Sequence, residues 1–315
     1  MATNRYLGVD PILTNVAIAY ENDEYVAEKL FPTLKVAKQS GQHFVYDQGR
    51  FRTSKNHGIR AAGGASEEVK HSLTTGLTYY CEDHAKKEFV TDEDVANNVQ
   101  TGNDPFADAT ENVRELQMVD REVELTTLLT TAGSYASAHK VTLSGTSLWS
   151  DYSNSDPIGD IRTGKTAIHA DIFKEPNKLV ISRGIFDKIV DHPDFLERIK
   201  YSQVGVTTEQ IIARILGVDE VIVAKAGKNT ATEGQTDDMG YIWGNFALLA
   251  YVDPNPRPKY ITLGLNYQWK NKIVQRLRGT NEEDRRGAFV RVGDDYRDDK
   301  LVSALAGYLI TTPIA

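Results

Sequence analysis

One segment of this 315-residue chain matches a nucleotide-binding pattern letter for letter. Residues 159–166 read GDIRTGKT, so Gly159, Gly164, Lys165 and Thr166 satisfy the phosphate-loop spacing G-x-x-x-x-G-K-[ST]. In such a loop backbone N–H groups wrap the phosphates, the lysine reaches the terminal phosphates and the hydroxyl holds magnesium. Asp253, which follows the apolar run 249–252, would supply a partner carboxylate. The pattern raises the hypothesis of a nucleotide-binding enzyme.

The context of this segment favours a surface helix instead. A phosphate loop follows a buried strand, whereas residues 149–157 read WSDYSNSDP and indicate a polar turn. Residues 158, 161, 165 and 168 recur at helical spacing, and Asp156 with Pro157 resembles a helix start. The two glycines would then be helix positions that permit close packing, and we expect no bound cofactor.

The sequence offers weaker evidence for other kinds of catalytic site. His84 lies three residues after Cys81, which would pair a nucleophile with a base, but no further residue completes the site. We expect a buried thiol beside Tyr79 and Tyr80. The seven histidines show no metal-ligand spacing, and the acidic clusters do not follow a calcium-binding loop. The sequence predicts neither a metal site nor an enzyme.

Composition narrows the class of protein. The apolar fraction is 40% and the charged fraction 25%, which is typical of a soluble globular protein. No apolar run is long enough for a membrane span, and the N-terminus lacks the layout of a secretory signal. The net charge of −8 argues against a dedicated nucleic-acid binder. We therefore expect a protein of the cytosol with no membrane contact.

The first fifty residues indicate an arm. Residues 10–47 contain a short helical stretch that is cut by Pro32 and leads into an extended polar run. Tyr25 and Phe31 belong to an apolar set too sparse to form its own core. These side chains must be buried against the rest of the chain or against another copy of it, and we predict them at a subunit interface.

Residues 49–76 predict an excursion from the body. The segment has five glycines and almost no apolar periodicity, and strand-like residues flank it at 44–46 and 77–80. A loop of this length is unusual inside a compact domain. A long two-stranded ribbon fits better, and since isolated ribbons are marginal in water, a neighbouring subunit would support it.

Residues 105–132 carry the signals of a long helix with defined start and end residues. Asp104 suits the N-cap and Pro105 the first helical position, and apolar residues then recur at three- and four-residue steps. The pattern predicts a helix over 105–132, roughly 40 Å long, with Gly133 as its stop. Residues 157–260 alternate helical and strand patterns, as in an α/β module, and the remainder to 315 is rich in strands.

Two clusters of basic residues are candidates for contacts between subunits. Glycines and acidic residues dilute both clusters, so intersubunit ion pairs or solvated loops fit them better than phosphate contacts. The clusters comprise Arg50, Arg52, Lys55 and Arg60, and then Arg276, Arg278, Arg285, Arg286 and Arg291.

Several segments resemble tailed-bacteriophage major capsid proteins: DPILTNVAIAYENDEYVAEKLFP in the arm, residues 151–168, residues 192–234 and WGNFALLAYVDP at 243–254. The resemblance implies an α+β fold of the Hong-Kong-97 type. Its parts would be an N-terminal arm (1–40), an extended β loop (41–82), a peripheral domain (83–150 and 261–315) that contains the spine helix, and an α/β axial domain (151–260).

The resemblance also implies a function. The chain would assemble into hexamers and pentamers of an icosahedral shell for double-stranded DNA, with portal, scaffolding and decoration proteins as partners. Assembly would occur in the host cytoplasm and the product would be the virion capsid. An encapsulin-like compartment remains the alternative of the same fold, and a phosphate-loop nucleotidase the alternative of another class.

Overall fold

The computed structural model describes residues 6–20, 22, 24–46, 59–66, 73–98, 104–200, 208–232, 234–257, 260–278 and 285–315. The helices are α1 (Pro11–Ala19), α2 (Ala27–Leu30), α4 (Asp92–Asn98), α5 (Pro105–Thr130), α6 (Pro157–Ile172), α7 (Arg183–Val190), α8 (Pro193–Ile199) and α9 (Glu209–Leu216). Short 3-10 turns span Ala132–Ser134, Ser137–His139, Gly145–Ser147 and Ala304–Ala306.

Within the described residues the strands form four sheets. They are β1 (Tyr6–Val9), β2 (Thr33–Lys35), β3 (Ser40–Tyr46), β4 (Leu73–Tyr80), β5 (Glu82–Thr91), β6 (Lys140–Thr142), β7 (Lys178–Ser182), β8 (Glu220–Ala224), β9 (Gly227–Asn229), β10 (Met239–Tyr241), β11 (Phe246–Ala250), β12 (Gly264–Gln268), β13 (Ile273–Leu277), β14 (Gly287–Leu301) and β15 (Gly307–Thr311). The mixed architecture confirms the predicted α+β class.

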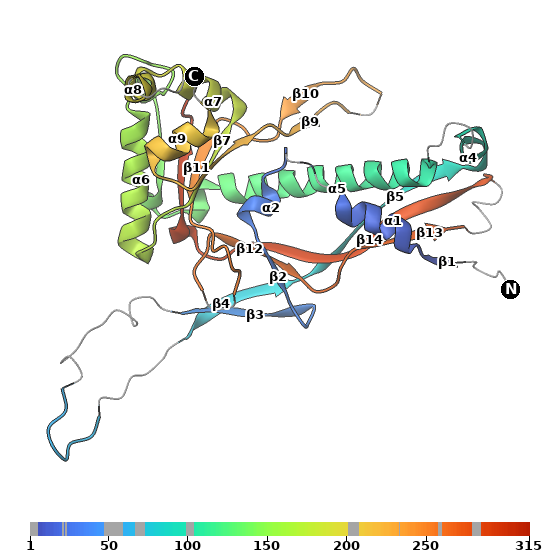
Figure 1. The fold of residues 1–315 in the computed structure, drawn as a ribbon, viewed down its shortest axis with the longest axis horizontal. Coiled ribbons are helices and arrows are strands. Elements are labelled where there is room, and N and C mark those ends of the chain that lie inside the picture. The colour runs from blue at the N-terminus through green and yellow to red at the C-terminus, as the bar shows by residue number, and fades with distance from the viewer. Residues whose placement is uncertain are drawn as a thin grey trace.

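The long helix α5 crosses the middle of the molecule (Figure 1). The Asp104 side chain accepts a hydrogen bond from the Phe106 N–H at 3.0 Å, and Pro105 occupies the first turn, as the sequence predicts. The helix ends at Thr130, two residues before the expected end. Its C-cap, Thr131, is extended, and Gly133 lies in the 3-10 turn that follows, so the change of direction precedes the glycine.

The largest sheet lies along α5. Its path is β1-β13-β14-β12-β2, and β5 pairs with the other edge of β14. The 15-residue strand β14 holds the sheet together, because β13 pairs with its first half, β12 with its second half and β5 with most of its length. Val113 of α5 packs against Val290 and Val292 of β14, so helix and sheet share an apolar core.

A second module lies at one end of α5 (Figure 1). Its five-stranded sheet has the order β6-β15-β11-β7-β8, accompanied by helices α6 to α9. Strands β6 and β15 come from the segments that the sequence analysis assigns to the peripheral domain, and both pair in this sheet. The physical reason is that every residue of β11 is buried, so this strand needs a partner on each edge, and β15 supplies one of them.

Strands β3 and β4 form the predicted ribbon. Ser40 pairs with Tyr80 and Tyr46 with Leu73 in antiparallel register, and the pair points away from the body (Figure 1). At the base of the ribbon the Tyr79 ring stacks on Tyr267 of β12, with ring centroids 4.6 Å apart.

Candidate assembly site: the docked N-terminal arm

The arm packs across its own subunit. The side chains of Leu13 and Ala17 in α1 are buried in the core that α5 shares with strands β13 and β14. Strand β1 adds an edge to β13, and the carboxylate of Asp10 caps α1 and pairs with Arg276 Nε at 3.0 Å. The described arm is therefore part of the subunit fold.

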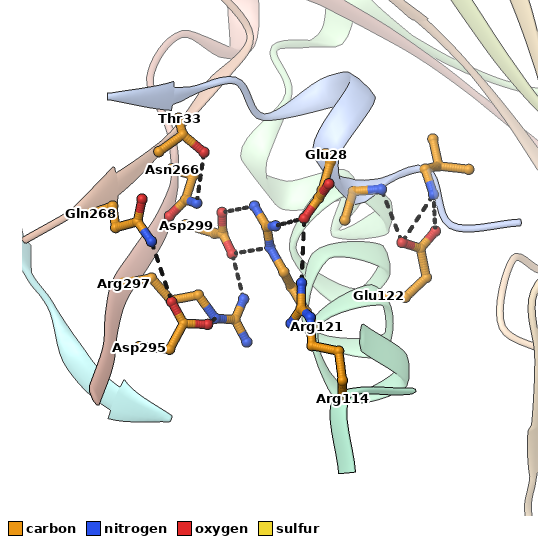
Figure 2. Close-up of polar contacts among 12 residues, drawn as sticks. Glu28, Thr33, Arg114, Arg121, Glu122, Asn266, Gln268, Asp295, Arg297 and Asp299 are labelled. Atoms are coloured by element: carbon orange, nitrogen blue, oxygen red, sulfur yellow. Dashed lines mark hydrogen bonds and ion pairs between the residues drawn. The ribbon is translucent and has the colours of Figure 1, made fainter. Parts of the chain in front are cut away.

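Helix α2 is held by one buried carboxylate of the spine helix. Glu122 is fully buried and accepts hydrogen bonds from the backbone N–H groups of Val26 (3.1 Å) and Ala27 (2.9 Å) (Figure 2). It also accepts a hydrogen bond from the indole N–H of Trp243. Burial raises the pKa of Glu122 although these hydrogen bonds oppose the shift. At the other end of α2, Lys178 Nζ donates to the Lys29 carbonyl at 2.7 Å. Arm, spine helix and α/β module are thereby linked.

Tyr25 and Phe31 are enclosed by their own chain. Tyr25 is 7% exposed and its hydroxyl donates to Glu115, while Phe31 is fully buried. A Cβ atom at Gly264 would lie only 2.5 Å from Phe31 Cζ, so the ring occupies space that a glycine leaves open. Of the two alternatives left open by the sequence, these contacts show burial against the same chain.

A cluster of buried charges lies beside α2. Arg121 of α5 forms a bidentate ion pair with Asp299 of β14, at 2.9 and 3.0 Å, and contacts Glu28 of α2 at 3.4 Å (Figure 2). Arg297 binds the same Asp299 at 3.0 Å. A bidentate guanidinium–carboxylate pair is strongly directional, so Arg121 and Asp299 orient α5 against β14. Glu28, whose side chain is 57% exposed, adds a weaker link from this pair to the arm.

Arg114 lies one heptad before Arg121 on the same helix face but is less well paired. It is 6% exposed, and its nearest carboxylate oxygen, on Glu28, is 3.6 Å from Nη2. Burial lowers the pKa of Arg114, whereas for Arg121 the ion pair with Asp299 overcomes the effect of burial and raises the pKa. The sequence patterns did not predict this cluster. Two arginines seven residues apart within an apolar helix pattern are the signal that could have revealed it.

Lys272 completes the positive side of the cluster and makes stability depend on pH. Burial, and then the charge of Arg114, lower its pKa to about 8; Arg121 acts in the same direction, while Asp295 and Glu28 oppose the shift. Between about pH 8 and the usual lysine pKa near 10.5 the unfolded chain holds the proton that the folded chain has lost, so stability rises with pH.

We expect Lys272→Met to remove this dependence, which contributes on the order of 1–3 kcal/mol across the window. Urea unfolding of both proteins from pH 7 to 10 measures it, because the tyrosine titrations cancel in the difference. Parallel pH profiles for the two proteins would contradict the assignment.

The C-terminal arginine cluster is used mostly within the subunit. Arg285 lies over the Phe89 ring, with its guanidinium 4.2 Å from the ring centroid. Arg286 adopts a left-handed φ of 49°, and its carbonyl accepts a hydrogen bond from the Asp92 N–H. Both are exposed.

The other arginines of this cluster form ion pairs inside the chain: Arg276 with Asp10, Arg278 with Asp92 and Arg291 with Asp83. These three pairs lie within one subunit. Arg60 is also exposed, and Arg50, Arg52 and Lys55 lie outside the described residues.

The phosphate-loop pattern lies inside helix α6, where it packs the module. Asp156 caps the helix by accepting from the Gly159 N–H at 2.8 Å. A Cβ at Gly164 would lie 2.7 Å from the Tyr308 ring, so this glycine allows α6 to approach β15. Lys165 Nζ donates to the carbonyls of Leu216 (3.2 Å) and Gly217 (2.7 Å) and caps the C-terminus of α9.

Thr166 and Asp253 also have structural partners. The Thr166 hydroxyl donates to the Arg162 carbonyl, and the Asp253 carboxylate accepts from the Asn255 N–H. No strand ends directly before α6, so the backbone cradle of a phosphate loop is not formed by these residues.

Lys165→Ala is expected to cost about 0.5–1.5 kcal/mol of unfolding free energy, because the last carbonyls of α9 lose a charged donor. Chemical unfolding measures this, with the exposed Lys174→Ala as the matched control. Calorimetric titration with magnesium-ATP should give no heat of binding for either variant or for the unaltered chain. Binding that disappears only in Lys165→Ala would restore the nucleotide hypothesis.

Cys81 is a structural thiol. It is fully buried, and its Sγ donates to the Tyr267 carbonyl at 3.4 Å. Burial raises its pKa to about 11, which leaves the unreactive thiol form at neutral pH.

Among the described residues no group of three or more His, Cys, Asp or Glu side chains is placed to hold a metal ion. No helix in the described part of the chain is long and apolar enough to cross a membrane.

Comparison with known proteins gives the class of this architecture. Residues 130–238 match the family described as phage major capsid protein E. Over 97% of both chains, the structure superposes on the crystal structure of a phage-related protein from Bordetella bronchiseptica RB50, with a TM-score of 0.77 and 28% identity. The capsid structure of cyanophage P-SCSP1u matches over 90% of this chain and 85% of its own, with a TM-score of 0.58 and 11% identity. The fold is that of Hong-Kong-97-like phage capsid proteins, as predicted.

The sequence gives the family. The chain is 30% identical to the major capsid protein of Burkholderia phage BcepMu over 96% of both chains. It belongs to the family of phage major capsid proteins.

Proposed function

We propose that this chain forms the shell of a tailed-phage particle by self-assembly into hexamers and pentamers that enclose double-stranded DNA. The observation that supports this most is the relationship to the BcepMu major capsid protein, which extends over nearly the whole length of both chains. Assembly takes place in the host cytoplasm, with a portal and scaffolding or decoration proteins as partners. Because a closed symmetric shell multiplies many contacts, each interface can be modest.

The β3–β4 ribbon is the proposed contact with a neighbouring subunit. An isolated two-stranded ribbon gains little stability in water, and this one stacks on its own subunit at its base, through Tyr79 and Tyr267. The exposed basic residues Arg60, Arg285 and Arg286 are proposed to meet acidic surfaces of neighbours, as are Arg50, Arg52 and Lys55. The net charge of −8 suits a container that holds DNA by weak, non-specific contacts.

Negative-stain electron microscopy of the chain expressed alone and with its scaffolding protein tests the proposal. Closed shells, or rings of five and six subunits, are the expected result. Packaged DNA in purified shells would separate a capsid from an enzyme compartment. Monomers under every condition would count against a shell function.

Replacing residues 47–72 by a short glycine-containing turn should abolish shells while leaving the subunit folded. The residues at the ribbon base stay in place. We therefore expect the free energy of unfolding to change by less than about 1 kcal/mol, as for surface changes in general. Circular dichroism monitors folding and light scattering monitors assembly. Normal shells from the shortened chain would show that residues 47–72 are dispensable for assembly.

A further inference from the structure

A cavity of about 290 Å³ opens where the arm crosses the spine helix, and its charges do not balance. Five cationic side chains line it, but only two acidic ones do. The cations are Lys35, Arg114, Arg121, Lys272 and Arg297, and the acids are Glu28 and Asp295. Asp299 lies next to the cavity and pairs with both Arg121 and Arg297. With Asp299 included, five cations face three carboxylates, so an excess of positive charge remains.

Three buried polar atoms of the cavity wall lack a hydrogen-bond partner: Arg114 Nε, Asn266 Oδ1 and Arg297 Nε. The last of these still lies 3.7 Å from Asp295 Oδ2 in an ion pair. Arg114 is 6% exposed and its Nε is an unpaired donor. Asn266 is 4% exposed; its Nδ2 donates to Thr33 Oγ1 at 3.2 Å, which leaves Oδ1 as an unpaired acceptor. Buried polar groups are nearly always satisfied, so an unpaired donor and acceptor on one charged cavity indicate a ligand.

We propose that this cavity binds inorganic phosphate in its hydrogen phosphate form. Arg114 and Lys272 would donate to the anionic oxygens, as guanidinium and ammonium groups do in phosphate sites. Asn266 Oδ1 would accept the P–OH proton, which sulfate does not have at neutral pH. The bound ion would connect the arm, through Thr33 and Glu28, to the spine helix and to the β12–β13 turn that carries Lys272.

The location excludes a nucleic-acid backbone as the ligand of this site. Arg114 and Asn266 are both more than nine-tenths buried behind the arm. A small free ion can enter the cavity, whereas a DNA duplex is too large to bring its phosphates to these side chains. The proposal concerns one subunit and is independent of shell formation, which lets the two be tested separately.

The experiment is a titration of the full-length chain with sodium phosphate, read by ³¹P NMR line width and by thermal unfolding, at constant ionic strength with chloride. We expect saturable binding and a rise in unfolding temperature that follows the same curve. Lys272→Met should weaken binding by about tenfold, since it removes one charge-assisted hydrogen bond. The exposed Lys38→Met, which makes the same charge change outside the cavity, should leave the affinity unaltered.

Lys272→Met removes a poorly neutralised cation, so this variant should fold and the test stays decisive. A phosphate effect that grows without saturation and is equal in all three proteins would be a general salt effect and would overturn the proposal. Equal affinity for sulfate would overturn hydrogen phosphate as the ligand.

Discussion

Glu122→Ala should destabilise the subunit by about 3–5 kcal/mol and release the arm. The substitution deprives three donors of their shared acceptor: the N–H groups of Val26 and Ala27 and the indole N–H of Trp243. Each buried donor left unsatisfied costs about 1–3 kcal/mol, and the loss is reduced because the carboxylate itself is no longer buried. Urea unfolding measures the loss of stability. Limited proteolysis followed by mass spectrometry should show new cleavage around residues 20–32.

Two further variants define the cause. Glu124→Ala removes an exposed carboxylate two residues along the same helix, and should change stability by less than about 0.5 kcal/mol. Glu122→Gln keeps one carbonyl oxygen but places an amide N–H₂ group against the other donors, so an intermediate loss is expected. If Glu122→Ala lost stability while the arm stayed resistant to protease, the carboxylate would be a core element without a role in holding α2.

The local elements could be predicted because their signals are local. Asp104 and Pro105 start α5, and Gly217 ends α9 with a left-handed φ of 65°. The alternation of β7 and β8 with helices needed only the apolar pattern. Helix α5 ends two residues before the predicted end, because Thr131 turns the chain before Gly133 and no side-chain pattern predicts that turn.

The docking of the arm could not be predicted, because it depends on residues distant in sequence. Glu28, Arg121 and Asp299 meet although 178 positions separate the last two. In the sequence each is one charge among many, and their partners are chosen by the tertiary fold. The same holds for Lys165, whose match to the phosphate-loop pattern reflects a helix cap on α9.

Phe31→Ala should cost about 3–5 kcal/mol of unfolding free energy, the usual range for removing a fully buried phenylalanine. The ring is fully buried between the arm and β12, and sheet pairing follows directly, since β2 begins at Thr33 beside Asn266. Loss of the ring should therefore loosen both the arm and the edge of the large sheet. Ile12→Ala, at a 75% exposed position of the same arm, is the matched control and should have little effect.

A double-mutant cycle with Gly264 tests whether the ring and the glycine form one packing unit. Gly264→Ala alone brings a methyl group to within 2.5 Å of Phe31 Cζ, so the ring must move, and overpacking of this kind costs about 1–3 kcal/mol. In the Phe31→Ala background the same methyl group enters the space that the ring has left. We expect the cost of Gly264→Ala to fall to near zero there, which gives a coupling energy of about 1–3 kcal/mol. Strict additivity would show that the cost of Gly264→Ala does not arise from its contact with the Phe31 ring.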